Sequence, residues 1–118
     1  MKLPVSDLSA SRDWYQRILG FQVEIEFIEG GEIRGLAIGD RDRTVRLALR
    51  LDPERAAALS GFDPVALAVP TRDDVQAWAE YLDGAGARHG GVVTGHRGGA
   101  VLVGLRDPDG IEIRLYAD

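Results

Sequence analysis

Residues 3–21, LPVSDLSASRDWYQRILGF, contain a short strand, a helix cap and a helix in succession. Asp7 stands where an N-cap would accept the free backbone N–H groups of a helix, and Gly20 follows its last apolar residue. Apolar side chains recur at three- and four-residue spacing, which places on one helix face Leu8, Tyr15, Ile18 and Leu19. The stretch therefore predicts a helix that covers one face of a sheet.

Three alternating stretches follow this helix, as expected of three strands: FQVEIEFIE at 21–29, EIRGLAIG at 32–39 and TVRLALRL at 44–51. The Gly30-Gly31 pair between the first two is typical of a tight hairpin turn. Strict alternation on the first strand predicts one shared face for Phe21, Val23, Ile25 and Phe27. Alternation on the third predicts a buried face of Val45, Leu47, Leu49 and Leu51.

The same order of elements then repeats. Residues 52–63 are interpreted as a linker with a short helical turn. PVALAV is a strand, and Thr71 with Asp74 forms a capping-box signature before a second helix, whose apolar stripe is Val75, Trp78, Ala79 and Leu82. The glycine-rich stretches HGGVVTGH and GAVLVGL are interpreted as strands, and the turn DPDG leads into the last strand, IEIRLY.

The two halves are interpreted as an internal duplication. A shift of 64 residues places Val5 on Val69 and Trp14 on Trp78, and a shift of 68 near the ends places Arg46 on Arg114. The predicted fold class is α+β, with two tandem βαβββ modules in a single domain over residues 1–118. The modules are residues 1–51 and 64–118, joined by the linker at 52–63.

Composition narrows the possible functions. The chain has 118 residues, of which 45% are apolar, so it can bury a core of its own. It has no cysteine, which excludes disulfides and thiolate metal sites. A net charge of −5 argues against a nucleic-acid partner, and no apolar run is long enough for export or a membrane span. We expect a cytoplasmic protein with no nucleic-acid or membrane partner.

Two stretches, LPVSDLSASRDWYQRILGF and DPDGIEIRLY, together resemble the glyoxalase, bleomycin-resistance and extradiol-dioxygenase superfamily, also called the vicinal oxygen chelate superfamily. The resemblance covers essentially the whole chain. It implies βαβββ modules whose curled mixed sheets surround a concave cavity, commonly completed in a homodimer. Members of the family include metal-dependent lyases, isomerases, dioxygenases and thiol transferases, and also metal-free proteins that bind an antibiotic.

The metal ligands that the resemblance implies are missing from this sequence. The second module's first-strand position is Pro64, which has no side-chain donor, and the first module's equivalent would precede Met1. The glutamate of the last strand falls on Arg114, and its counterpart at a shift of 68 is Arg46. A guanidinium repels a cation and cannot ligate it. The sequence predicts neither a metal site nor a cofactor.

The candidate ligand-binding residues are Arg46, Arg50, Glu112, Arg114 and Tyr116. Alternation on the last strand turns Glu112, Arg114 and Tyr116 toward the cavity, opposite its apolar set. Arg46 and Arg50 face the same way on the counterpart strand. Three arginines would form a cationic wall suited to a carboxylate, a phosphate or an electron-rich ring. The alternative is that Arg114 pairs with Glu112 or another acid and that Arg46 and Arg50 lie at a solvated rim.

Other candidates are weaker. His89 and His96 are seven residues apart, a spacing that sends them to opposite faces of a continuous strand. They are interpreted as strand-end residues, although a bulge could join them with Glu112 in a cryptic metal site. Glu24 and Glu26 are interpreted as members of a solvated strand face and not as acid–base groups.

Two functions remain open. The first is a metal-free protein that binds a small, anionic or aromatic molecule in the cavity between the modules. The alternative is an enzyme of the same superfamily: a lyase, isomerase or dioxygenase that holds a metal with non-standard ligands, or a metal-independent enzyme. No catalytic residue is assigned. An open module of about 55 residues exposes a sheet edge and a bare face unless it meets another module, in the same chain or in a second one. Because similar proteins often dimerise, a homodimer is expected.

Overall fold

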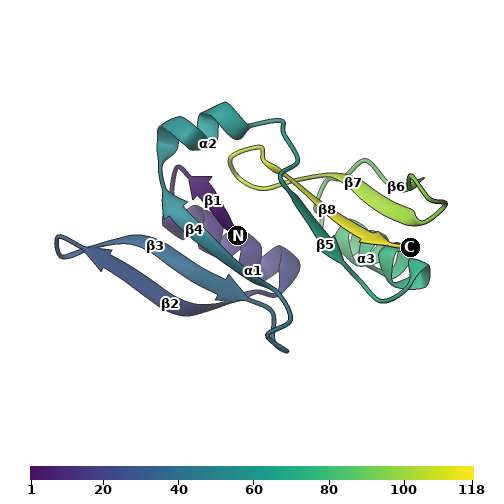
Figure 1. The fold of residues 1–118 in the computed structure, drawn as a ribbon, viewed down its shortest axis with the longest axis horizontal. Helices are drawn as coiled ribbons and strands as arrows, with labels where there is room; N and C mark the ends of the chain where they lie inside the picture. Colours follow the sequence, from purple (N-terminus) through teal and green to yellow (C-terminus); the bar gives the residue numbers. More distant parts are fainter. The chain divides into compact units, whose positions relative to one another are not determined.

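A computed structural model describes residues 1–118, which form two compact units, Met1–Ser60 and Gly61–Asp118. The first contains β1 (Lys2–Val5), α1 (Leu8–Leu19), β2 (Gln22–Glu29), β3 (Glu32–Gly39), β4 (Arg46–Leu51) and α2 (Pro53–Leu59). The second contains β5 (Val65–Ala68), α3 (Arg72–Gly84), β6 (Val92–Thr94), β7 (Ala100–Arg106) and β8 (Glu112–Ala117). The predicted α+β class and the two βαβββ arrangements are confirmed (Figure 1).

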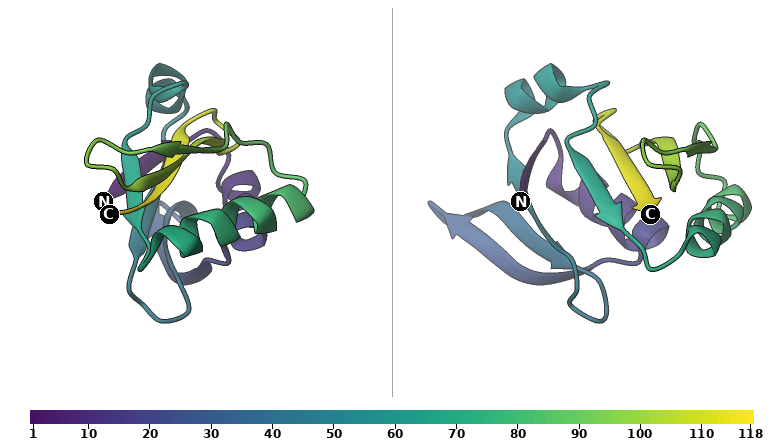
Figure 2. Two further views of the ribbon diagram at one scale, coloured as in Figure 1. Left: turned by 90° about the vertical axis from the view of Figure 1, so that its right-hand side faces the viewer. Right: turned by 45° about the vertical axis from the view of Figure 1, so that its right-hand side comes forward.

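Each unit holds one four-stranded mixed sheet. The strand orders are β1-β4-β3-β2 and β5-β8-β7-β6, so the first and last strands of each βαβββ arrangement lie side by side. These two are parallel, and the other neighbours are antiparallel. Parallel neighbours need a crossover, and α1 and α3 with the hairpins after them supply it. Each helix thereby packs on one face of its own sheet (Figure 2).

Capping residues place both long helices where the sequence predicts them. The Asp7 carboxylate accepts from the backbone N–H of Ala10 at 3.0 Å, and Gly20 ends α1 in the left-handed conformation with φ of 72°. Thr71 and Asp74 form the complete capping box of α3.

The cores follow the predicted stripes. In the first unit Tyr15, Ile18, Leu19, Leu36, Ile38, Leu47 and Leu49 are buried, and in the second Val75, Ala79, Leu82, Leu102, Leu105, Ile113 and Leu115.

A β-bulge in β2 overturns the predicted single face of Phe21, Val23, Ile25 and Phe27. Val23 pairs with Ile38, but Ile25 pairs with Ala37, so Glu24 is an extra residue on β2. One extra residue turns every following side chain to the other face. Ile25 and Phe27 therefore leave the helix-covered side and are more than two-fifths exposed.

The strand register corrects the alignment of the two halves. Lys2 pairs with Ala48, and its equivalent Ala66 pairs with Arg114. The counterpart of Arg114 is thus Ala48, at a shift of 66 and not 68, and Arg46 corresponds to Glu112 instead. A slip of two residues preserves the face of every side chain, which is why alternation alone could not detect it.

The predicted linker at 52–63 contains a defined helix, α2. The Asp52 carboxylate accepts from the backbone N–H of Arg55 at 3.1 Å, and Pro53 occupies the first turn, where its missing N–H costs nothing. Ala56 is buried against the first unit. The boundary between the two units, after Ser60, lies inside the same stretch. No helix of the chain is long and apolar enough to cross a membrane.

Removing the Asp107 carboxylate should destabilise the turn before β8. This buried side chain accepts from the backbone N–H groups of Asp109 at 2.9 Å and Ile111 at 3.0 Å. Asp107→Ala leaves both donors without this acceptor, and we expect a loss of about 1–3 kcal/mol in the free energy of unfolding, measured by urea titration. Asp42→Ala, at an exposed loop residue, is the matched control. Equal stability of the two variants would contradict this role.

Candidate ligand-binding faces

The face of the first sheet opposite α1, called here the open face of the first unit, has a floor of small residues. Strand register places on it Gly35, Ala37, Gly39 and Ala48. Ile25 and Phe27 stand beside this floor on β2, because the bulge at Glu24 turns them there. A Cβ at Gly35 would lie 2.9 Å from the carbonyl oxygen of Leu49 and 3.6 Å from the Phe27 ring. Glycine thus keeps the floor low enough for an aromatic ring to lie against it.

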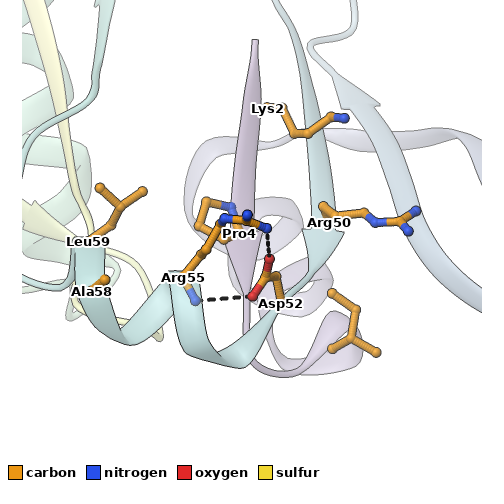
Figure 3. A pocket seen from close by; sticks show the side chains of 8 residues that line it. Lys2, Pro4, Arg50, Asp52, Arg55, Ala58 and Leu59 are labelled. Carbon is orange, nitrogen blue, oxygen red and sulfur yellow. Dashed lines mark hydrogen bonds and ion pairs between the residues drawn. The ribbon is translucent and has the colours of Figure 1, made fainter.

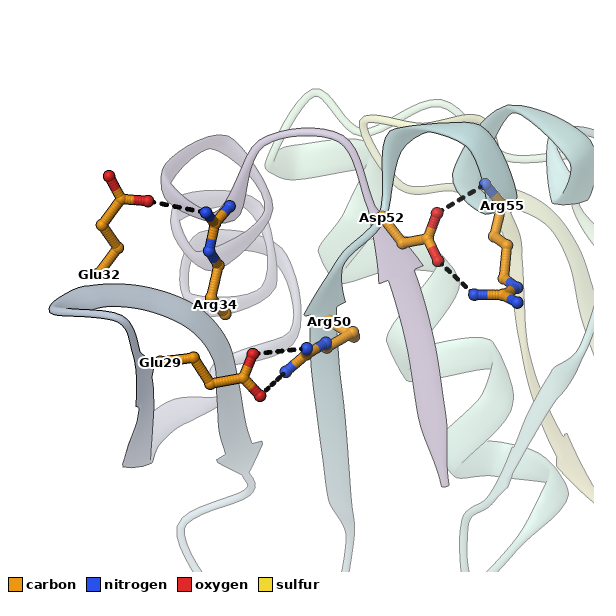
Figure 4. A network of polar contacts seen from close by, with 6 residues as sticks. All are labelled: Glu29, Glu32, Arg34, Arg50, Asp52 and Arg55. Carbon is orange, nitrogen blue, oxygen red and sulfur yellow. Dashed lines mark hydrogen bonds and ion pairs between the residues drawn. The ribbon is translucent and has the colours of Figure 1, made fainter.

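Both predicted arginines of this face are paired with carboxylates of β2. The Nε of Arg46 donates to Glu24 at 2.8 Å, and its Nη2 lies 2.7 Å from the same carboxylate oxygen. Arg50 makes a bidentate ion pair with Glu29, in which its Nη1 donates to Oε1 at 3.0 Å and its Nη2 donates to Oε2 at 2.8 Å (Figure 4). The hydrogen bond from Arg50 lowers the pKa of Glu29 below its ordinary value, so the carboxylate stays charged beside its partner. Neither guanidinium is left as a free cation.

Two hollows adjoin this floor. A pocket of about 200 Å³ is lined by Lys2, Phe27, Glu29, Gly35, Ala48, Leu49 and Arg50. A larger one of about 680 Å³ lies between β1, the end of β4 and α2, and its lining includes Pro4, Arg55 and Leu59 (Figure 3). Lys2 and Arg50 line both. Arg55 is held by Asp52 at 2.7 Å. The sequence analysis assigned no role to α2, although Asp52-Pro53 is a helix-start signal.

The open face of the second unit, opposite α3, carries a groove of about 450 Å³. Register places Ala66 beside Arg114, Ala68 beside Tyr116, and Val101 on the other side of Tyr116. The groove also reaches the hairpin tip between β6 and β7. Its lining is Asp63, Ala66, Gly95, His96, Arg97, Gly99, Val101, Arg114, Tyr116, Ala117 and Asp118. Two of the predicted ligand-binding residues, Arg114 and Tyr116, thus line the same groove.

Arg114 lies between two carboxylates. Its Nε donates to Glu112 at 2.6 Å and lies 3.2 Å from Asp63. Burial raises the pKa of Glu112, but the hydrogen bonds from Arg114 and from the Gly104 backbone outweigh it, so that the pKa is lowered overall. Gly104 belongs to an irregularity in the β7–β8 register. The predicted alternative, Arg114 paired with Glu112 or another acid, is therefore the arrangement found.

The structure brings together only part of the predicted site. Arg46 and Arg50 share one face of β4 in the first unit, whereas Glu112, Arg114 and Tyr116 share one face of β8 in the second. Sequence reasoning missed the acids that neutralise these arginines. Alternation did place Glu24 opposite the apolar set of its strand, but no local signal linked it to Arg46, which is 22 residues away.

The chain's own donors do not fit the metal of the family's enzymes. His89 is engaged elsewhere: its Nε2 lies 2.7 Å from Asp83, and its Nδ1 accepts from the backbone N–H of Gly91 at 3.0 Å. Glu112 is held by Arg114. No group of three or more histidine, aspartate or glutamate side chains is placed to hold a metal ion. The cryptic site of His89, His96 and Glu112 is therefore contradicted.

Comparison with known proteins identifies the class. The model of the Glyoxalase/Bleomycin resistance protein/Dioxygenase superfamily matches residues 1–115, and the chain belongs to this superfamily. One similar structure is UcmS2, with 23% identity and a TM-score of 0.81; the match covers 100% of this chain and 95% of that one. Another is TnmS3, an antibiotic binding protein from Streptomyces sp. CB03234, with 26% identity and a TM-score of 0.75; the match covers 98% of this chain and 89% of that one.

A third similar structure is a fosfomycin resistance protein, FosX, from Listeria monocytogenes. It has 14% identity and a TM-score of 0.71, with coverage of 100% of this chain and 89% of that one. At this level of identity the likeness shows the fold alone. No curated protein matches the sequence.

Replacing Glu112 should change how stability depends on pH. A carboxyl whose folded pKa lies below its ordinary 4.5 contributes stability that is complete above that value and is lost as pH falls through the folded pKa. Glu112→Gln cannot titrate, so it should be less stable than the wild type at pH 7, and the gap should close below pH 4.5. Urea unfolding across this range measures the gap. Glu80→Gln, at an exposed residue of α3, should run parallel to the wild type; a Glu112→Gln gap that does not change with pH would refute the linkage.

Proposed function

We propose that the chain is a metal-free binding protein that takes up a small, largely apolar, ring-containing molecule against the open faces of its two sheets. The observation that supports this is the chemistry of those faces: small residues and aromatic side chains form the floor, and Arg46, Arg50 and Arg114 are each paired with an acid. That both faces enclose one cavity remains a prediction.

Pairing changes which ligand the faces favour. A carboxylate that approached Arg50 would have to displace Glu29 from a two-pronged pair, and one that approached Arg114 would meet the charges of Glu112 and Asp63. A flat apolar ring can lie on these faces without displacing an ion pair. Arg46 and Arg50 are four residues apart on β4, so their Cα atoms are separated by about 13 Å. That span has room for two fused rings over Ala48.

One similar protein supports a binding role: TnmS3 is described as an antibiotic binding protein. The enzyme alternative is favoured by the likeness to a lactoylglutathione lyase from Agrobacterium tumefaciens, at 15% identity and a TM-score of 0.70. Against it stand Pro64, Arg114 and, by the corrected register, Ala48 at the positions that the resemblance assigns to metal ligands.

Filling the groove should weaken binding. Ala66 is exposed on β5 beside Arg114, and Ala66→Trp would occupy the space over Val101 and Tyr116. With 2-methylnaphthalene as the probe, followed by amide chemical shifts, we expect the affinity to fall about tenfold or more because a full ring is displaced. Ala57→Trp, on the exposed side of α2, is the matched control. No saturable shift in the wild type, or unchanged affinity in Ala66→Trp, would refute this site.

We further propose that the protein is a homodimer. The β2–β3 hairpin supports this, because it exposes apolar side chains on both of its faces: Ile25 and Phe27 on the open face, and Ile28 and Ile33, which are 63% and 43% exposed, near its tip. Four large apolar side chains exposed on one hairpin are typical of a surface that contacts another protein chain.

Charges on the hairpin should separate the subunits. For the wild type, light scattering is expected to give twice the chain mass of 12.8 kDa, and Ile28→Glu/Ile33→Glu is expected to give a single chain, because buried unpaired carboxylates oppose association. Tyr81→Glu, at an exposed aromatic residue of α3, is the control and should stay dimeric. A monomeric wild type would refute the dimer, and a dimeric double variant would refute this interface.

A further inference from the structure

The tip of the β6–β7 hairpin, residues 95–99, lies at one end of the groove in the second unit and is closed by backbone hydrogen bonds. The backbone N–H of Gly95 donates to the carbonyl of Gly99 at 2.6 Å, and the N–H of Gly98 donates to the carbonyl of Gly95 at 3.1 Å. A Cβ at Gly99 would collide with the carbonyl oxygen of Ala117, so the tip packs directly on the end of β8. Residues at this tip therefore have defined positions relative to the groove.

His96 and Arg97 at this tip are polar side chains of the groove without a partner in the chain, as are the Tyr116 hydroxyl and the Asp118 carboxylate. Both tip residues are exposed and line the groove, and neither makes a hydrogen bond or ion pair. Arg114 contrasts with them, because Glu112 and Asp63 hold it. The other histidine contrasts too, because His89 is used between Asp83 and Gly91.

We propose that His96 and Arg97 recognise an acidic oxygen substituent, a carboxylate or a phenol, on the ring-containing molecule that the groove binds. This inference rests on the proposed function and assigns the polar half of the same site. The ring would lie over Ala66, Val101 and Tyr116, and its substituent would point to the hairpin tip. The anion-binding role that alternation predicted for Arg114 is thus assigned to His96 and Arg97 instead.

Charge around the groove supports this division of roles. Asp63 faces the groove but is offset by Arg114, 3.2 Å away. Asp118 also lines the groove: its main-chain carbonyl accepts from Arg72 at 3.3 Å, and its side-chain carboxylate is unpaired, so the anionic substituent is expected to lie on the side of the tip away from it. Arg97 must give up no ion pair to meet a ligand, whereas Arg114 must give up two. A free guanidinium offers its fork of donors to a carboxylate at full strength, and an imidazole nitrogen adds a further hydrogen bond.

The test compares two probes of one shape, 2-naphthoate and 2-methylnaphthalene, by amide chemical-shift titration. We expect the wild type to bind 2-naphthoate about tenfold more tightly, the effect of one hydrogen bond to a charged group. His96→Gln/Arg97→Gln should bind both probes with the affinity of the wild type for 2-methylnaphthalene. Arg88→Gln, an exposed arginine outside the groove, is the matched control and should keep the preference. Circular dichroism shows whether the double variant is folded. The two single variants are titrated beside it.

The outcomes distinguish a failure of the proposed function from a failure of this inference alone. If the wild type binds neither probe, the proposed function is wrong and the inference is wrong with it. If it binds both probes equally, the groove binds rings but the tip does not select an acidic oxygen, and only the inference is wrong. If Arg114→Gln removes the preference while the tip variants keep it, recognition belongs to Arg114 and the assignment to the tip is overturned.

Discussion

Each four-stranded sheet of this protein has a single helix to cover it, and this constraint shapes the rest of the molecule. One face of each sheet buries its apolar side chains under α1 or α3. The opposite face has no helix and must be stable in another way. It is built from small residues and paired charges, a chemistry that tolerates exposure and also leaves room for a ligand.

The charged pairs on these open faces are a consequence of that exposure. An arginine on such a strand attracts a carboxylate across the sheet, as Arg50 on β4 attracts Glu29 on β2 beyond the intervening β3, or from its own strand, as Arg114 attracts Glu112. Such pairs neutralise the arginine charges on these faces. The proposed preference for a flat apolar ligand follows from this pairing, and the proposed anion selectivity is assigned to groups outside the pairs, such as Arg97 at the hairpin tip.

Superfamily membership places this chain on a scaffold that hosts many functions. The βαβββ arrangement is kept, with its parallel β1–β4 and β5–β8 pairs. The side chains on the faces of this scaffold decide its chemistry. Here Arg46 and Arg50 stand on β4 and Arg114 on β8, and each is held by an acid.

The sequence by itself determined the elements of this protein. Helix periodicity, the caps at Asp7 and Thr71 and the turn residues act over a few neighbouring positions, so α1, α3 and most strands could be predicted. The tertiary structure alone decided the bulge at Glu24, the register that equates Arg114 with Ala48, and the partners of the arginines. These depend on contacts between residues distant in the chain, and a period of two cannot distinguish a strand from the same strand slipped by two residues.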